Sequence, residues 1–260
     1  MKINDKMRTK ILCISLIVIC LSGIVYSGGR LFFVGKEYMD GRSEYDRISK
    51  DAIKNVDKEE QTIDFEHLLQ VNGDTVGWIK FPKEPSQINY PIVQCGDNST
   101  YLHQTFYGEA NPVGTIFIDC NNRSDFGDGN TIVYGHRMKD GSMFRELQSY
   151  REKSFWKENQ YFYIYTLDGR KIKYHIYAAG RTSSKSEAYK IKFSSEKEFK
   201  KFVDYTKKIS DYDTDVDIEY NRQIVTLSTC TSENDEHRIV VFGVKEEEKQ
   251  IQESVLNSKE

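Results

Sequence analysis

The feature that most constrains this 260-residue chain is an unbroken apolar run near its N-terminus. Residues 11–29 carry no charged side chain, and as a helix they would extend about 28 Å, enough to cross the hydrocarbon core of a bilayer. A cleaved signal peptide has a similar pattern, but no clear Ala-x-Ala site follows this run. We therefore expect a transmembrane signal anchor over residues 11–29.

The charges around this run predict its orientation. Four Lys or Arg side chains against one Asp give residues 1–10 a net charge of +3, so the rest of the chain carries −6 of the total of −3. By the positive-inside rule, residues 1–10 are expected in the cytoplasm and everything after Arg30 outside the cell. Beyond the anchor, carboxylates balance the Lys and Arg residues and no basic face is evident, which argues against a nucleic-acid partner. We predict a single-pass protein of the cell membrane with an extracellular body.

The extracellular part divides by composition into three segments. Residues 30–62 are rich in charge and place apolar side chains at mostly helical intervals, which predicts a charged helical spacer lying against a larger body. Residues 63–246 have the length of one ordinary domain. Residues 247–260 are expected to form a polar tail.

Short runs of β-branched and aromatic residues separated by turn residues dominate the expected domain. Strands are predicted at 75–81, 88–94, 114–119, 130–134, 160–167, 170–179, 223–230 and 237–244. The Asp168-Gly169 pair is typical of a tight hairpin between the fifth and sixth of these. Eight such strands indicate a barrel, so the fold class is mainly β with added helices (α+β).

Helical signals interrupt the strands in three places. Ser195 and Glu198 form a capping box that predicts a long helix inserted between the sixth and seventh strands. Weaker helical patterns cover residues 97–106 and 142–150.

The five cysteines do not form a zinc-binding pattern. Cys13 and Cys20 lie in the apolar run, and no Cys-x-x-Cys spacing occurs anywhere. Cys95 and Cys120 could form a disulfide outside the cell, which the sequence leaves open because it does not give their distance. We expect neither a metal nor an organic cofactor.

Cys230 is the strongest candidate for chemistry. It ends a β-branched run at the predicted mouth of a strand, and Arg238 follows eight residues later at the start of the next strand. A hairpin-like return would bring the guanidinium near the thiol, where it would favour thiolate and could donate to an oxyanion. The alternative is that Cys230 is a small buried hydrophobe.

A partner for Cys230 must come from the five histidines. Tyr134-Gly135-His136 ends an apolar strand and precedes a polar loop, which makes His136 the best candidate for a general acid or base. The remaining four are better explained as structural or solvated: His67, His103, His175 and His237.

These motifs together resemble the signature of the sortases. Thr226-Leu227-Ser228-Thr229-Cys230 is followed by Arg238 and preceded by Tyr134-Gly135-His136, in family order behind an anchor. The resemblance extends over residues 65–244. The segment 97–102 before the strand at 114–119, and the long helix before the cysteine strand, are similar to class B.

The resemblance implies a fold, a reaction and partners. It implies an eight-stranded sortase barrel in which Cys230 is the nucleophile, His136 and Arg238 are its essential partners, and Ser228 and Thr229 are substrate-binding candidates. The implied substrates are secreted proteins with a C-terminal sorting signal of the Asn-Pro-x-Thr type, cleaved after Thr in a Gram-positive bacterium. The implied acceptor is an amine of a peptidoglycan precursor or cross-bridge, reached through a thioester.

Three alternatives remain open at this point. One is a pilus-type sortase that uses a pilin lysine as acceptor, and another is a peptidoglycan-acting Cys/His enzyme or secreted protease. The third is a non-enzymatic, membrane-tethered binding module with a structural Cys230. One feature departs from simple expectation, because the acidic loop 233–236 would disfavour a nearby thiolate and Arg238 would have to offset it.

Overall fold

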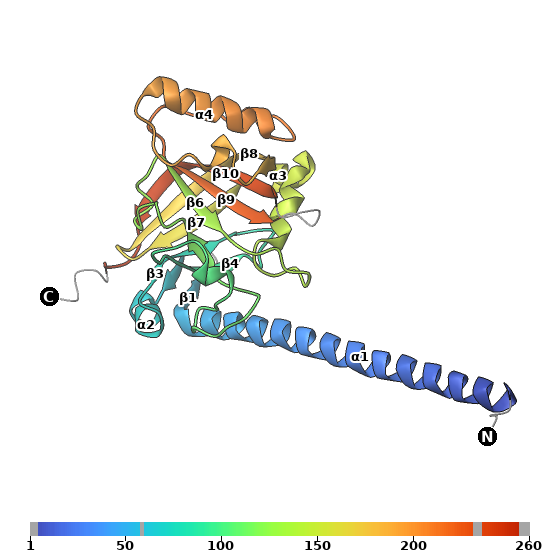
Figure 1. The fold of residues 1–260 in the computed structure, drawn as a ribbon. Coiled ribbons are helices and arrows are strands. Elements are labelled where there is room, and N and C mark those ends of the chain that lie inside the picture. The colour runs from blue at the N-terminus through green and yellow to red at the C-terminus, as the bar shows by residue number, and fades with distance from the viewer. Residues whose placement is uncertain (1–4, 58–59, 231–235, 255–260) are drawn as a thin grey trace.

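The computed structural model describes residues 5–57, 60–230 and 236–254. Its first element, α1 (Asp5–Ala52), is a single helix that continues from the apolar run into the charged spacer without a break. It projects from the body of the molecule (Figure 1). Among the described residues, it is the one helix long and apolar enough to cross a membrane.

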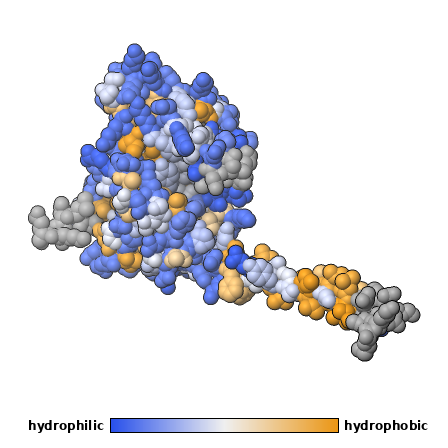
Figure 2. All heavy atoms as spheres, in the orientation of Figure 1, coloured by the Kyte–Doolittle hydropathy of each residue, from blue (hydrophilic) through white to orange (hydrophobic). Residues whose placement is uncertain are grey.

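The two halves of α1 differ in how far their apolar side chains are exposed. Apart from Tyr220, the exposed large apolar side chains of the described residues lie between Ile11 and Met39 (Figure 2). Closer to the body, Tyr45, Ile48 and Ala52 are buried. The last turns of α1 are therefore part of the folded domain.

The expected spacer at 30–62 is more structured than its composition indicates. After α1, β1 (Ile53–Asp57) and β2 (Glu60–Ile63) form an antiparallel hairpin, which was not predicted. Two strands this short have too few residues to show an alternating pattern. The hairpin is followed by α2 (Phe65–Val71), capped by the Asp64 side chain, which accepts from the backbone N–H of His67.

Eight strands close into a barrel in the order β10-β8-β7-β3-β4-β5-β6-β9, which confirms the predicted architecture. The strands are β3 (Thr75–Lys80), β4 (Asn89–Val93), β5 (Ile116–Ile118), β6 (Asn130–Tyr134), β7 (Tyr161–Thr166), β8 (Arg170–Ser183), β9 (Ile224–Cys230) and β10 (His237–Gln250). Neighbours are antiparallel except for the pairs β4–β5 and β6–β9, which are parallel. All eight runs identified in the sequence supply one strand each.

The last strand is longer than expected. β10 pairs with β8 as far as Gln250 opposite Arg170, four residues beyond the domain end expected at 246. The charged side chains that gave this stretch the look of a tail instead form cross-strand ion pairs, such as Arg170 with Glu248 at 3.2 Å. The β7–β8 turn has Gly169 at φ +85°, as the Asp-Gly pair predicts.

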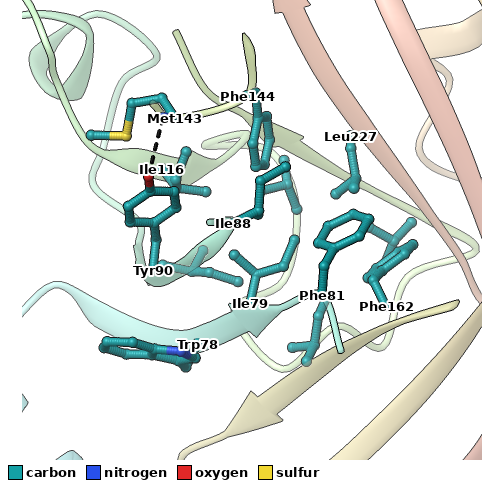
Figure 3. Packing of buried hydrophobic residues seen from close by; sticks show 14 of the residues in the cluster. Trp78, Ile79, Phe81, Ile88, Tyr90, Ile116, Met143, Phe144, Phe162 and Leu227 are labelled. Atoms are coloured by element: carbon teal, nitrogen blue, oxygen red, sulfur yellow. Dashed lines mark hydrogen bonds between the residues drawn. The ribbon is translucent and has the colours of Figure 1, made fainter. Parts of the chain in front are cut away.

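Two apolar clusters stabilise the domain. The larger fills the barrel with aromatic and aliphatic side chains, including Trp78, Phe81 and Phe162 (Figure 3). The smaller lies on the outer face of the sheet, where α4 (Glu196–Ile209) packs Phe199 and Phe202 against it. Ser195 caps this helix, as predicted, and α4 lies on the opposite side of the barrel from α1 (Figure 1).

The weaker helical signals give only short turns. Near 97–106 the structure has η1 (Thr100–Leu102), and near 142–150 it has η2 (Arg145–Arg151), both 3₁₀ helices. The remaining short helices are α3 (Lys153–Glu158) and η3 (Glu187–Tyr189). Asp97 explains the first case, because its side chain accepts from the backbone N–H groups of Ser99 and Thr100 and fixes a turn.

Candidate active site

Three adjoining strands bring the sequence candidates to one end of the barrel. β6 and β9 are parallel with Tyr134 opposite Ser228, so the chain two residues later on each strand, at His136 and Cys230, reaches the same level. β10 returns antiparallel and pairs Arg238 with Cys230. The side chain of Cys230 and residues 231–235, which include most of the acidic loop, lie outside the described residues.

Two glycines make room for His136. At Gly135, a Cβ would lie 2.5 Å from the Cδ1 atom of Ile116, so a larger residue would displace the chain that leads into the histidine. At Gly114, where φ is +61°, a Cβ would lie 2.9 Å from the Cδ2 atom of His136 and 2.6 Å from the carbonyl oxygen of Tyr101. The imidazole therefore lies directly against the backbone that precedes β5.

A backbone contact sets the tautomer of His136. Its Nε2 atom lies 2.6 Å from the carbonyl oxygen of Leu102. A carbonyl oxygen can only accept, so Nε2 carries a proton and Nδ1 holds the lone pair of the neutral ring. Burial lowers the pKa of His136, the bond to Leu102 opposes this, and His103 lowers the pKa slightly further. The neutral ring is therefore favoured at neutral pH, with Nδ1 as the basic atom.

Arg238 is held at the edge of the same site. It pairs with Thr182 on one side and Cys230 on the other, and its Nη1 atom donates to the carbonyl oxygen of His237 at 3.0 Å. Arg238 as a whole is partly exposed. A partly exposed cation beside the strand end avoids the full cost of burying a charge, and it can attract a developing anion there.

Sequence reasoning missed a buried carboxylate that lies beside the site. Asp119, only 7% exposed, accepts from the hydroxyl of Tyr134 at 3.0 Å and from Nδ2 of Asn98 at 2.9 Å. Burial raises the pKa of Tyr134, the charge of Asp119 raises it further, and Arg238 opposes the shift. The hydroxyl proton of Tyr134 is therefore donated to Asp119, and the phenolic oxygen of Tyr134 remains able to accept a hydrogen bond. No local pattern distinguishes Asp119 from an ordinary strand-end aspartate.

The two candidate substrate-binding hydroxyls are both covered. Ser228 is 1% exposed, and its Oγ lies 2.9 Å from the hydroxyl of Tyr189, whose ring stacks on Tyr134. Thr229 is 2% exposed, and its Oγ1 has no hydrogen-bond partner among the described residues. A peptide would reach Ser228 only if Tyr189 moved, so Tyr189 and Tyr134 form the accessible surface here.

The remaining histidines and the cysteines Cys95 and Cys120 have other positions in the fold. The ring of His175 on β8 packs at a tilt against Tyr161, with 4.6 Å between ring centroids. His67 lies on α2 and His237 begins β10, whereas His103 follows η1 near His136. Cys95 and Cys120 are both free thiols, so the disulfide left open by the sequence is not formed. Within residues 5–57, 60–230 and 236–254, no three His, Cys, Asp or Glu side chains are grouped as metal ligands.

Comparison with known proteins agrees with this geometry. Residues 79–246 match the family model of the sortase domain. The chain is 31% identical over 238 residues to sortase B of Listeria monocytogenes, covering 88% of this chain and 94% of that protein. It is 32% identical over 208 residues to sortase B of Staphylococcus aureus, covering 78% and 83%.

Solved structures give the same result. The Staphylococcus aureus sortase B–substrate complex matches with a TM-score of 0.70 at 28% identity, covering 82% of this chain and 99% of that one. Sortase B from Bacillus anthracis matches with a TM-score of 0.70 at 32% identity and the same coverage. The chain therefore belongs to the sortase family of cysteine transpeptidases, and it is most like the class B sortases.

Proposed function

We propose that this transpeptidase cleaves sorting signals of the Asn-Pro-x-Thr type after Thr and transfers the released protein to a peptidoglycan amine, with Cys230 as nucleophile. The observation that carries the assignment of residues is the juxtaposition of His136, Cys230 and Arg238 by the registers β6–β9 and β9–β10. The substrate class is supported by similarity to sortase B of Staphylococcus aureus, which has been solved as a substrate complex, and to a sortase B solved with triglycine.

In the first half of the reaction, the thiolate of Cys230 attacks the carbonyl carbon of the Thr residue in the signal. Arg238 stabilises the oxyanion, and its planar fork can donate two hydrogen bonds at once. As the C–N bond breaks, protonated His136 gives its Nδ1 proton to the departing amine, which leaves a thioester on Cys230. Nε2 keeps its bond to the carbonyl of Leu102 throughout, so the ring does not have to rotate.

In the second half, the acceptor amine attacks the thioester carbonyl. Its nitrogen forms the new amide bond, the C–S bond breaks and Cys230 leaves as thiolate. Neutral His136 takes the amine proton at Nδ1 and is ready for the next cycle. The lowered pKa of His136 favours this half, because the neutral base predominates, and it limits the first half, which needs the protonated ring.

Ser228 and Thr229 form the buried layer of the proposed substrate site. Ser228 holds Tyr189 through their 2.9 Å contact and so acts on a bound signal through that ring, or directly once Tyr189 moves aside. Thr229 contributes the buried strand position directly before the nucleophile.

The proposed membrane topology is based on α1. We propose that residues 11–29 cross the membrane, that residues 1–10 are cytoplasmic, and that the catalytic domain at 63–246 lies outside the cell beyond the spacer at 30–62. Of the polar segment 247–260, residues 247–250 belong to β10 and pair with β8. Exposure of the apolar half of α1 supports a surrounding lipid phase.

The test is transfer by the full chain in detergent micelles. Peptides with varied signals are incubated with several amines, including glycine peptides and lysine side-chain amines, and the products are identified by mass, with Cys230→Ala as control. Cleavage after Thr with amine attached supports the proposal. Hydrolysis that no amine diverts would indicate a protease instead, preference for a lysine side chain would indicate a pilus-type enzyme, and turnover by Cys230→Ala would refute the nucleophile.

A further inference from the structure

A polar pocket separate from the strand-end site opens between α1 and the loop after His136. Its volume is about 400 Å³. From α1 it is lined by Arg42, Tyr45 and Asp46, and from the loop by Asp140, Ser142 and Met143. No part of the mechanism described above uses these residues.

The loop wall of this pocket is tied to the backbone of the proposed acid–base residue. The backbone N–H of Phe144 donates to the carbonyl oxygen of His136 at 2.9 Å, and Arg137 pairs with Met143, so the loop closes on itself. The N–H of Met143 donates to the hydroxyl of Tyr90 at 3.2 Å, which fixes the loop against β4 (Figure 3).

The helix wall leads to the same residue. The hydroxyl of Tyr45, a buried residue on α1, donates to the carbonyl oxygen of Gly114 at 2.6 Å. Gly114 is the residue that lies against the imidazole of His136. Each wall of the pocket is therefore linked to His136 through an intervening residue, the loop wall through Phe144 and the helix wall through Gly114.

The charge of the pocket favours a cation. Two carboxylates, Asp46 and Asp140, and one guanidinium, Arg42, line it. Burial raises the pKa of Tyr90 to about 12, and the charges of Asp140 and Asp46 add to the shift while Arg42 opposes it, so all three charged groups act on a phenol that lines the pocket. The other polar side chains that line it include Ser49, Ser86, Gln87, Asn89 and Ser142, which can bond peptide amides.

The pocket lies on the part of α1 that is close to the proposed membrane anchor. Arg42 lies about 20 Å along the continuous helix beyond the end of the apolar run at Gly29. The pocket is therefore on the side of the domain from which the proposed anchor extends, within reach of a molecule carried on the same membrane surface.

We propose that this pocket binds the amine-bearing peptide of the acceptor, with its ammonium group between Asp46 and Asp140 before it moves to His136. The inference rests on the proposed transpeptidation and adds the site of the second substrate. The ammonium releases one proton to solvent as it leaves the pocket, the free amine attacks the thioester carbon and gives its second proton to Nδ1 of His136, and the C–S bond breaks to release the Cys230 thiolate.

The test measures how the acyl-enzyme divides between water and amine in the full chain in detergent micelles. The variants are Asp46→Asn, Asp140→Asn and the double variant, and the probes are triglycine and a peptide with a lysine side-chain amine. Asp140→Asn keeps the oxygen that accepts from Ser142, so the loop turn is preserved. Asp51→Asn is the matched control, because Asp51 is exposed on the same helix and loses the same charge outside the pocket.

Each single variant should raise the KM for the amine peptide about 2- to 5-fold, and the double variant about 10-fold, as expected for partly solvated ion pairs. Transfer to hydroxylamine, a small nucleophile that is uncharged at neutral pH, should fall much less. Asp51→Asn should match the wild type. An unchanged KM in the double variant, or an equal loss with hydroxylamine, would overturn the inference.

A binding measurement separates this inference from the proposed function. If the wild type forms no thioester with any signal peptide, the proposed function fails, but the pocket can still be tested in the Cys230→Ala chain. Titration with triglycine should perturb the NMR signals of the loop at Asp140 and Ser142, and the double aspartate variant should weaken this binding. Absence of perturbation there rules out the pocket whatever the catalytic result.

Discussion

Replacing Tyr45 by Phe removes one hydroxyl from the contact that joins α1 to the catalytic domain. That hydroxyl donates to the carbonyl oxygen of Gly114 at 2.6 Å and lies 3.1 Å from Oγ1 of Thr115. It has a single proton, and the shorter contact defines its main bond. Both Tyr45 and Gly114 are buried, so water cannot replace the lost donor without a rearrangement.

The size of the effect follows from that burial. Leaving a buried carbonyl without its donor costs about 1 to 3 kcal/mol, a large part of the roughly 5 to 15 kcal/mol by which domains are stable. For a chain of this size, about 2 to 4 °C of Tm is lost per kcal/mol, so the shift should be on the order of 2 to 12 °C. Because Gly114 supports His136, kcat should fall several-fold while the KM for the sorting peptide changes little.

The assay is thermal unfolding of the full chain in micelles, followed by near-UV circular dichroism, together with peptide turnover. Tyr38→Phe is the control, because Tyr38 is on the same helix and its hydroxyl has no hydrogen bond within the described residues. That control should stay within about 0.5 kcal/mol of the wild type. Equal Tm values for Tyr45→Phe and Tyr38→Phe would refute the reasoning.

Four further predictions concern the proposed chemistry. Cys230→Ala should abolish thioester formation without unfolding, whereas Cys95→Ala and Cys120→Ala should remain active in the same mass assay. Arg238→Lys should lower kcat by about 10²–10³-fold although charge is kept, because lysine lacks the planar fork; near-wild-type turnover would exclude a bidentate role. The pKa of His136 in the folded protein is below its unfolded value of about 6.5. The neutral ring therefore stabilises the fold above that pH, and this stabilisation is lost on acidification. The drop in the urea midpoint of unfolding from pH 7.5 to 5.5 should accordingly be smaller in His136→Gln than in the wild type. A chelator should change neither structure nor activity, and loss of either would reveal a metal requirement.

The sequence by itself determined the features that depend on neighbours along the chain. An uncharged run of sufficient length predicts a spanning helix, a Ser-x-x-Glu box predicts the start of α4, and Asp168-Gly169 predicts the β7–β8 turn. Each signal is complete within a few residues, because the backbone geometry it serves is local. The eight strand runs were likewise visible, since burial on a sheet imposes an alternating or continuous apolar pattern.

Local patterns were less reliable where a short element depends on its surroundings. The helical signal at 142–150 became a 3₁₀ turn, since the loop before it is held by the bond from Met143 to Tyr90, which the local pattern does not contain. The last residues of β10 form a strand because they pair with β8, and the β1–β2 hairpin is held to the body by the bonds between the backbone of Ile63 and the side chain of Gln252.

Only the tertiary structure decided how the site is assembled. Closure of the barrel places β6 beside β9, as in the 2.7 Å bond from Thr226 to Asn130, which are 96 residues apart, and this pairing brings His136 level with Cys230. The same closure buries Asp119 beneath Tyr134, covers Ser228 with Tyr189 and fixes the His136 tautomer through Leu102. These contacts join residues with no shared local pattern, and their geometry exists only once the strands have paired.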